Sequence, residues 1–429
     1  MTLRPSIGVG LALALAAVAL AAPVSVSIQS PEPGRFELHR AGRPYYVRGA
    51  GVDGHLDELV AAGGNSIRTW GAEQATKVID DAGRRGLTVC AGLWIEHERG
   101  GFDYDNAVAV RAQVDRLCRT VDRLKDKPAL LLWGVGNEVE FQSRNPKVWE
   151  TIEAVAAYIK RVDPHHPVMT VITHPRPAIV AEIRRRCPSI DILGCNSYAG
   201  LRVLAADVRA CGWTGPYLVT EWGTDGSWEV AKTPWGAEIE PTSAEKAALF
   251  AARYRAIAAD RERCLGSYAF LWGQKQEATP TWFGLFTEDG RASEAVEVLA
   301  AAWSERPLET KTPQVGPLTL NGALAQAGVT LAPGAVAKVE GSILRGASAG
   351  LRVRWELLPE RRHKGAGGDP EKRPKALRLP PQETAPSGER CVAEFAAPRK
   401  PGAYRIFVYI EGPHSTVAHA NLPFLVVAP

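Results

Sequence analysis

Two glutamates in this sequence each come just after a short run of apolar, β-prone residues. Glu138 comes after the run 129–135 (ALLLWGV), and Glu221 comes after the run 217–219 (YLV). A carboxylate at the carboxyl end of a buried parallel strand lies where barrel enzymes place their active sites. Two carboxylates that converge on one pocket are the minimum apparatus for cleaving a glycosidic bond. The pattern therefore predicts a paired-acid site.

The elements that would position these acids form a regular alternation. Between residues 45 and 303, short apolar runs alternate with longer amphipathic stretches, which is typical of βα units and a parallel sheet. The predicted strands are 45–50, 66–69, 88–94, 130–136, 168–171, 190–196, 217–220 and 267–272. The predicted helices are 55–62, 72–83, 107–125, 146–161, 178–186, 201–210, 243–263 and 293–303. Eight such units predict an α/β fold, the (β/α)₈ or TIM barrel, over residues 22–306 with an N-terminal lead-in strand.

The pattern changes after residue 306. Residues 307–315 are polar and contain prolines, as expected of a linker. Residues 316–429 hold short β-prone runs separated by Gly and Pro turns, which predicts an all-β sandwich as an accessory domain. Within it, residues 361–375 are rich in charge, Gly and Pro, and we expect an exposed, solvated loop there.

The N-terminus has the features of a secretory signal. Arg4 supplies the positive charge, residues 7–20 are apolar, and Ala19-Leu20-Ala21 forms an A-x-A cleavage site. We therefore expect residues 1–21 to be a signal peptide, the mature protein to be periplasmic or extracellular, and no membrane span to remain after cleavage.

Composition narrows the class of partner. The net charge of +4 is small, and there is no basic stripe with interleaved aromatic residues, so nucleic acid is not an expected partner. The twelve tryptophans suit a carbohydrate substrate, because flat rings stack on sugars. The seven cysteines form no metal-binding motif, so we expect no metal and no cofactor. Cys187 and Cys211 could form a disulfide in an exported chain, whereas Cys90 and Cys195 should be buried thiols. The sequence gives no indication of an oligomeric state.

Several motifs together resemble a known family. They are FELHRAGRPYYVRGAGV at 36–52, NSIR at 65–68, GNE at 136–138 and TEWG at 220–223. This set resembles the barrels of glycoside hydrolase clan A, with glycoside hydrolase family 2 the nearest. The C-terminal sandwich looks like an appended immunoglobulin-like module.

The resemblance assigns roles to residues at the strand ends. It implies that Glu138 is the acid/base and Glu221 the nucleophile. It also implies that Asn137 binds the sugar 2-hydroxyl, that Arg68 and Tyr198 hold the nucleophile, and that Trp272 forms the floor of the sugar subsite. Trp94 ends the third predicted strand and His97 follows it, and both are further candidates for contacting substrate.

The chemistry that follows is double displacement. Two carboxyls about 5–5.5 Å apart favour retention of the anomeric configuration. We expect Arg68 to keep Glu221 ionised and the neighbouring negative charge to raise the pKa of Glu138. The leading hypothesis is an exported retaining glycoside hydrolase that acts on a β-linked glycan. A transglycosidase of the β-glucanosyltransferase type would use the same residues, and a non-catalytic glycan-binding envelope protein is the alternative from another class.

Overall fold

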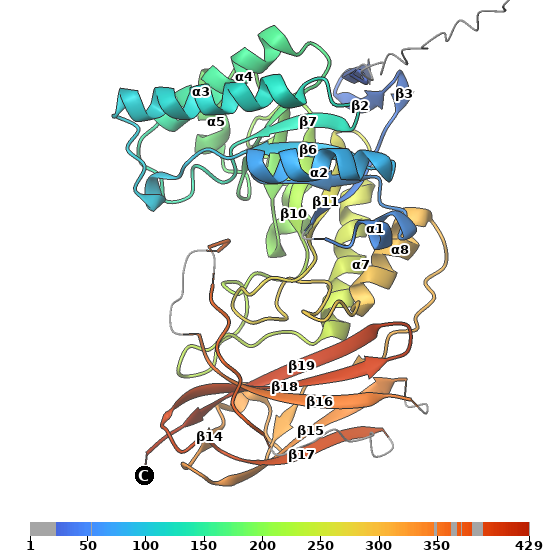
Figure 1. Cartoon of the computed structure of the whole chain (residues 1–429), viewed down its shortest axis with the longest axis vertical. Helices are drawn as coiled ribbons and strands as arrows, with labels where there is room; N and C mark the ends of the chain where they lie inside the picture. The colour runs from blue at the N-terminus through green and yellow to red at the C-terminus, as the bar shows by residue number, and fades with distance from the viewer. Residues whose placement is uncertain are drawn as a thin grey trace, which may run out of the picture.

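Eight parallel strands close into a barrel in the order β10-β11-β4-β5-β6-β7-β8-β9 (Figure 1). The chain is described by a computed structural model over residues 23–52, 54–346, 350–361, 367–369, 371–379 and 389–428, so the predicted signal peptide 1–21 lies outside the described residues. The barrel strands are β4 (Val47–Val52), β5 (Ser66–Arg68), β6 (Thr88–Leu93), β7 (Leu130–Val135), β8 (Val168–Ile172), β9 (Ile192–Asn196), β10 (Tyr217–Trp222) and β11 (Cys264–Trp272). The predicted TIM barrel is confirmed.

Each barrel strand is followed by helical structure that covers the outer face of the barrel. The helices are α1 (Leu56–Ala61), α2 (Ala72–Arg84), α3 (Ala107–Leu124), α4 (Lys147–Val162), α5 (Pro177–Arg186), α6 (Leu204–Ala210), α7 (Ser243–Ala259) and α8 (Glu294–Ser304), with short 3₁₀ turns η1 (Glu98–Gly100) and η2 (Ala199–Val203). A continuous apolar core joins these helices to the outward-facing strand residues, among them Val219, Trp222 and Ala269.

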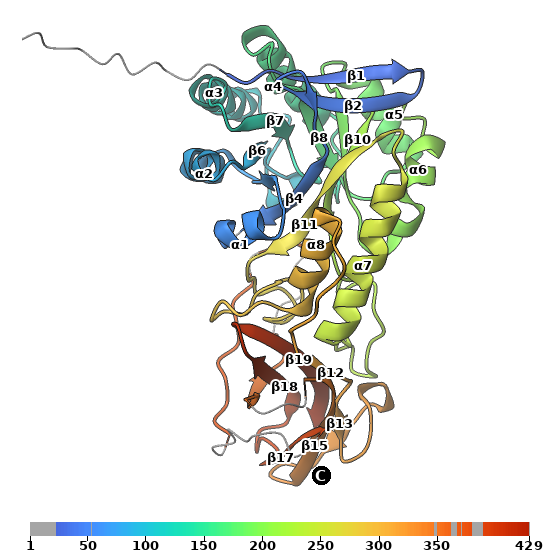
Figure 2. The ribbon, with the colours of Figure 1, turned by 90° about the vertical axis from the view of Figure 1, so that its right-hand side faces the viewer.

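A small antiparallel sheet covers the end of the barrel where the strands begin. It consists of β1 (Val26–Glu32), β2 (Arg35–Arg40) and β3 (Arg43–Pro44). Val26 and Leu38 pack into the same buried cluster as Leu131, Leu218 and Tyr268 inside the barrel. Figure 2 shows β1 and β2 at one end of the molecule and the C-terminal module at the other. The carboxyl ends of the barrel strands therefore face this module.

The C-terminal module is a sandwich of two four-stranded sheets, as predicted. One sheet has the order β12-β15-β13 with β17 paired to β15, and the other has the order β14-β19-β18-β16. The strands are β12 (Gln314–Val315), β13 (Thr319–Leu320), β14 (Thr330–Leu331), β15 (Val336–Arg345), β16 (Arg352–Pro359), β17 (Arg390–Ala396), β18 (Gly402–Gly412) and β19 (Thr416–Val426), with a 3₁₀ turn η3 (Ala325–Ala327). Their inward-facing residues, such as Val353, Ile406 and Phe424, form a separate apolar core.

A buried polar network joins the module to the barrel. Lys246 of α7 donates to Glu240 Oε1 at 2.5 Å, and its side chain and that of Glu240 are 7% and 0% exposed. Asn421 of β19 donates to the other oxygen, Glu240 Oε2, at 2.6 Å. Arg405 of β18 donates to the backbone carbonyl of Glu238 at 2.7 Å. A charged pair buried at this depth, with further hydrogen bonds from the module, holds the two domains in one arrangement.

Because the ion pair is buried, we expect the Lys246→Met variant to lose about 3–5 kcal/mol of unfolding free energy, since Glu240 would keep an uncompensated charge. Urea titration followed by circular dichroism measures this. The control is Lys77→Met, which removes an exposed partner of Glu73 on α2 and should shift the midpoint far less. Equal shifts in the two variants would contradict a stabilising role for the network.

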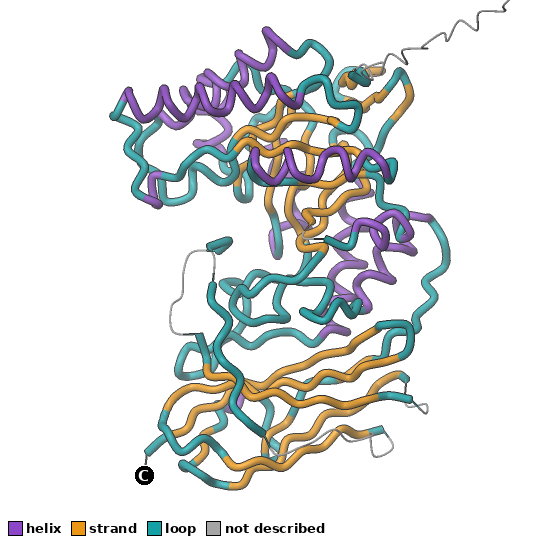
Figure 3. The backbone as a smooth tube through the Cα atoms, in the orientation of Figure 1, coloured by secondary structure: helices purple, strands orange, loops and turns teal. Residues whose placement is uncertain are grey.

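The expectation of a solvated loop over residues 361–375 is wrong for several of its described residues. Arg361 and Glu371 form an ion pair whose side chains are 10% and 9% exposed. Glu371 also accepts a hydrogen bond from the backbone N–H of Ala278 at 2.9 Å, and Asp369 pairs with Arg99 at 2.8 Å. Figure 3 shows loops filling the region between the barrel and the sandwich. The charge and Gly content of this segment indicated exposure. The contacts that bury these residues come from loops remote in sequence, which a local pattern does not record.

The cysteines are all free thiols in the structure, so the suggested Cys187–Cys211 disulfide is not formed. Cys90 and Cys195 are buried, as expected. Within the described parts of the chain, no helix has both the length and the apolar character needed to cross a bilayer.

Candidate active site

The turn after β7 places Glu138 at the mouth of the barrel. Gly136 has φ +76° and Glu138 has φ +51°, so both residues adopt the left-handed conformation. A non-glycine residue in this region costs of order 1 kcal/mol, and such strain is concentrated at functional sites. The backbone N–H of Glu138 donates to Val171 O of β8 at 2.9 Å, which fixes the turn.

A β-bulge in β10 brings Glu221 to the same mouth. Val219 pairs with Cys195 of β9, and Glu221 pairs with the next residue, Asn196, so β10 carries one extra residue there. Val219 faces the outer helices, and strict alternation would direct Glu221 to them as well. The bulge turns the Glu221 side chain toward the barrel axis instead, which is a common use of bulges beside active sites.

Three donors converge on the Glu221 carboxylate. Arg68 Nη1 donates to Oε1 at 2.8 Å, and Trp70 Nε1 donates to the same oxygen at 2.7 Å. Tyr198 Oη donates to Oε2 at 3.0 Å. The Arg68 and Glu221 side chains are only 3% and 9% exposed, so this is a buried ion pair. The donors hold both oxygens in a fixed orientation, as a nucleophilic carboxylate requires.

A short polar chain connects Glu221 to Glu138. Arg68 Nη2 donates to Asn137 Oδ1 at 2.6 Å, and Asn196 Nδ2 donates to the same oxygen at 3.2 Å. Asn196 Nδ2 also donates to Glu138 Oε1 at 2.7 Å. Since the Asn137 oxygen accepts both bonds, its NH₂ group is the end that can donate to a ligand.

The surroundings of Glu138 raise the pKa of its carboxyl. Burial is the largest cause that raises the pKa of Glu138, to about 8, and the negative charge of Glu221 is the second. A carboxyl with such a pKa keeps its proton at neutral pH and can act as an acid. Burial and the Glu221 charge also raise the pKa of Tyr198 well above its usual value, so this phenol remains a donor.

His97 and Trp94 lie beside this network. His97 Nε2 lies 2.7 Å from Asn137 O, and since a carbonyl only accepts, this nitrogen carries the proton. Burial lowers the pKa of His97, which favours the neutral ring. The Trp94 ring packs on the His97 ring with centroids 4.8 Å apart. His97 thus fixes the backbone of Asn137, and Trp94 supports His97.

The structure does not place Trp272 with the pair. Its side chain is fully buried against Trp303 of α8, and its Nε1 donates to His55 O at 2.9 Å. A β-bulge is the reason: Ala269 pairs with Ala50 of β4, and Trp272 pairs with Val52, so three steps on β11 match two on β4. Trp272 therefore shares the outward face of Ala269, and its predicted role as the subsite floor is wrong.

Phe270 occupies the position at the mouth that was expected of Trp272. Its ring lies edge-on to Trp70 and Tyr198, with centroid distances of 5.8 and 6.2 Å. Asn196 and Trp70 were not among the site residues predicted from the sequence. Signals for both were present, because Asn196 ends β9 with an amide and Trp70 stands two positions after Arg68.

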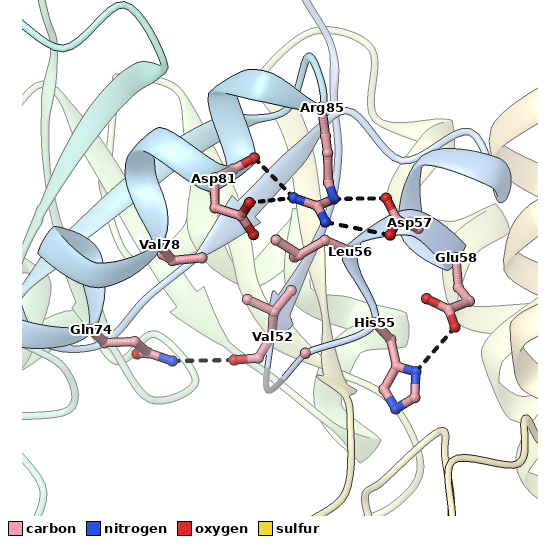
Figure 4. Close-up of a pocket in the computed structure, with 10 residues that line it drawn as sticks. Val52, His55, Leu56, Asp57, Glu58, Gln74, Val78, Asp81 and Arg85 are labelled. Carbon is pink, nitrogen blue, oxygen red and sulfur yellow. Dashed lines mark hydrogen bonds and ion pairs between the residues drawn. The ribbon is translucent and has the colours of Figure 1, made fainter.

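A separate hollow of about 470 Å³ lies between α1 and α2 (Figure 4). Its wall carries the ion pairs of Arg85 with Asp57 and Asp81, and Gln74 donates to Val52 O at 3.2 Å. Neither glutamate of the pair lines it. Among the described residues, no group of three or more His, Cys, Asp or Glu side chains is arranged to hold a metal ion.

The chain has a parallel eight-stranded barrel with glutamates at the carboxyl ends of its fourth and seventh strands, the edge where barrel enzymes place their active sites. Residues 65–225 match the family model described as Glycosyl hydrolases family 2, TIM barrel domain. This match confirms the resemblance predicted from the sequence.

Solved structures that align with the chain include two β-glucuronidases. A β-glucuronidase from Ruminococcus gnavus, in complex with uronic deoxynojirimycin, aligns over 65% of this chain and 52% of its own, with 18% identity and a TM-score of 0.50. An FMN-binding β-glucuronidase from Facaelibacterium prausnitzii L2-6 aligns over 94% and 59%, with 14% identity and a TM-score of 0.49. The chain thus spans about half the length of these two β-glucuronidases. No curated protein sequence matches the chain.

Proposed function

We propose that the protein is a retaining glycoside hydrolase that cleaves O-glycosidic bonds of a β-linked glycan. The observation that carries the proposal is the polar chain from Glu221 through Arg68 and the amides of Asn137 and Asn196 to Glu138. It joins a fixed carboxylate to a carboxyl whose pKa is raised, which is the division of roles that double displacement needs.

In the proposed first step, Glu221 attacks the anomeric carbon and the bond to the leaving oxygen breaks. Glu138 gives its proton to that oxygen, so the aglycone departs as a neutral alcohol. In the second step, Glu138 takes a proton from water, and the resulting oxygen nucleophile displaces Glu221. The Asn137 NH₂ group is placed to donate to a sugar hydroxyl as charge develops on the ring.

A non-catalytic glycan-binding protein does not need this arrangement. It would gain nothing from a buried Arg68–Glu221 pair or from strain at Glu138. A transglycosidase would use the same two glutamates and differ in whether a sugar or water accepts the glycosyl unit. Adding a sugar acceptor to the assay separates these outcomes by the product formed.

The test is a panel of nitrophenyl β-glycosides, including β-glucuronide, followed by proton NMR of the first product formed from an accepted substrate. Retention predicts that the β-anomer appears first and mutarotates later. Initial release of the α-anomer, or no turnover on the panel and on natural β-glycans, would contradict the proposal.

The raised pKa of Glu138 gives a prediction for the pH profile. Its carboxyl must carry a proton in the first step, so kcat/KM should fall as pH rises through about 8, not near the value of a free carboxyl. A profile on a substrate with a poor leaving group measures this. Loss of activity already between pH 4 and about 5 would show that Glu138 is not held protonated.

We also propose that the protein is exported, with residues 1–21 as the signal. Arg4, the apolar stretch 7–20 and Ala19-Leu20-Ala21 support this. N-terminal sequencing of the mature protein should give Ala22 as the first residue, and an intact Met1 in a cytoplasmic fraction would contradict it.

A further inference from the structure

We propose that residues 367–369 of the C-terminal module form a specificity-determining wall of the substrate site. We call these residues the roof segment. This proposal rests on the proposed glycosidase function. It identifies the part of the chain that limits the size of the substrate. The segment is the short piece between two grey traces just below the barrel in Figure 1.

The roof segment contacts loops on opposite sides of the barrel mouth. Asp369 Oδ1 accepts from Arg99 Nη1 at 2.8 Å, and Arg99 lies in η1, after β6. Gly367 lies against the indole of Trp228, after β10, because a Cβ on this glycine would come within 2.9 Å of the ring. In the closed order β4 to β11, β6 and β10 are the third and seventh strands and lie opposite each other. The segment therefore bridges loops on opposite sides of the mouth.

A third loop fixes the middle of the segment. Lys275 Nζ, after β11, donates to Gly368 O at 3.2 Å, and Gly368 N donates to Glu277 Oε1 at 2.9 Å. Lys275 also pairs with Glu277 at 2.6 Å and lies 5.6 Å from the centre of the Phe270 ring. Both backbone polar groups of Gly368 are thus bound by the barrel, which favours one defined position of the segment.

The residues that contact the two ends of the segment lie next to the catalytic network. Trp228 lies edge-on to Tyr198 with ring centroids 5.6 Å apart, and Tyr198 donates to Glu221. On the opposite side, Arg99 stands two positions after His97, which donates to Asn137 O. Trp228 is nevertheless 52% exposed as a residue, so its ring can still stack on a sugar or an aglycone.

The position of the segment would restrict a long substrate. A glycan that continues past the cleaved bond must leave the mouth, and the roof segment joins loops on opposite sides of that mouth. The buried Lys246–Glu240–Asn421 network fixes the module that carries it. Such a wall acts by excluding bulky substrates, and the Arg99–Asp369 pair is the contact that holds it.

The test compares kcat/KM for an oligosaccharide with kcat/KM for a nitrophenyl glycoside of the same terminal sugar. Asp369→Ala and Arg99→Gln should each raise the ratio of oligosaccharide to nitrophenyl glycoside by about tenfold, because the excluded chain gains access. The charge exchange Arg99→Asp with Asp369→Arg should return it toward the wild-type value. The matched control is Arg345→Gln, which breaks another ion pair between module and barrel, with Glu294 of α8, and should leave the ratio unchanged.

Hydrogen–deuterium exchange gives a readout without substrate. Arg99→Gln should raise exchange in peptides that contain residues 367–369, whereas Arg345→Gln should not. If the wild type is active, and the Arg99 and Asp369 variants show unchanged ratios and unchanged exchange, the proposed role of the roof segment is wrong while the proposed function stands. A wild type inactive on every glycoside would overturn the proposed function and the wall with it.

Discussion

Replacing Glu221 with Gln is expected to lower turnover by about 10⁴-fold or more, because the amide cannot form the glycosyl-enzyme bond. The substitution keeps the shape of the side chain and an oxygen that can accept from Arg68 Nη1 or Tyr198 Oη. The loss should therefore appear in kcat, and the far-UV circular dichroism should stay close to that of the wild type. The melting temperature should fall, because Arg68 keeps a buried charge without its ionised partner.

The control for this variant is Glu262→Gln. Glu262 pairs with Arg209 just before β11, and its side chain is 71% exposed. A surface substitution of this kind should leave activity within about twofold. If Glu221→Gln retained activity comparable to that of Glu262→Gln, Glu221 would not be the nucleophile.

Replacing Glu138 with Gln is expected to lower activity by an amount that depends on the leaving group. The amide oxygen can still accept from Asn196 Nδ2, so the site should remain assembled. It cannot give a proton to the leaving oxygen, and general acid catalysis of this kind contributes about 10²–10⁴-fold. The loss in kcat/KM should reach that size for an alkyl glycoside and be small for a dinitrophenyl glycoside, whose leaving group needs no proton.

The second step offers an independent check on Glu138. Azide attacks the glycosyl-enzyme without a general base, so it should raise turnover of the dinitrophenyl substrate by the variant and give a β-glycosyl azide. The wild type should show no such increase. Equal losses for both leaving groups, with no azide product, would show that Glu138 does not act as the acid/base.

The sequence predicted the barrel well because its signal is local and repeated. Each strand is a short apolar run, and each is followed by an amphipathic stretch. Once eight such units are in place, the carboxyl ends of the strands must meet at one mouth. This is why the strand ends predicted that Glu138 and Glu221 lie together, whereas Arg68, Asn137 and Tyr198 were candidates only through the family resemblance.

The sequence could not show which way a side chain faces where the strand is irregular. One bulge in β10 turns Glu221 inward, and another in β11 turns Trp272 outward and leaves Phe270 at the mouth. Both follow from register against neighbouring strands, which no local pattern records. The same limit applies to Asp369, whose partner Arg99 is 270 positions away.

The role of Glu221 as the nucleophile can be measured by peptide mapping after inactivation with a 2-deoxy-2-fluoro glycoside of the accepted sugar. Such a compound forms the glycosyl-enzyme and is released slowly, so mass spectrometry can locate the bond. Double displacement by this pair predicts one added glycosyl unit per chain, on Glu221, and none in the Glu221→Gln variant. A label on another residue, or inactivation without a covalent adduct, would contradict double displacement by this pair.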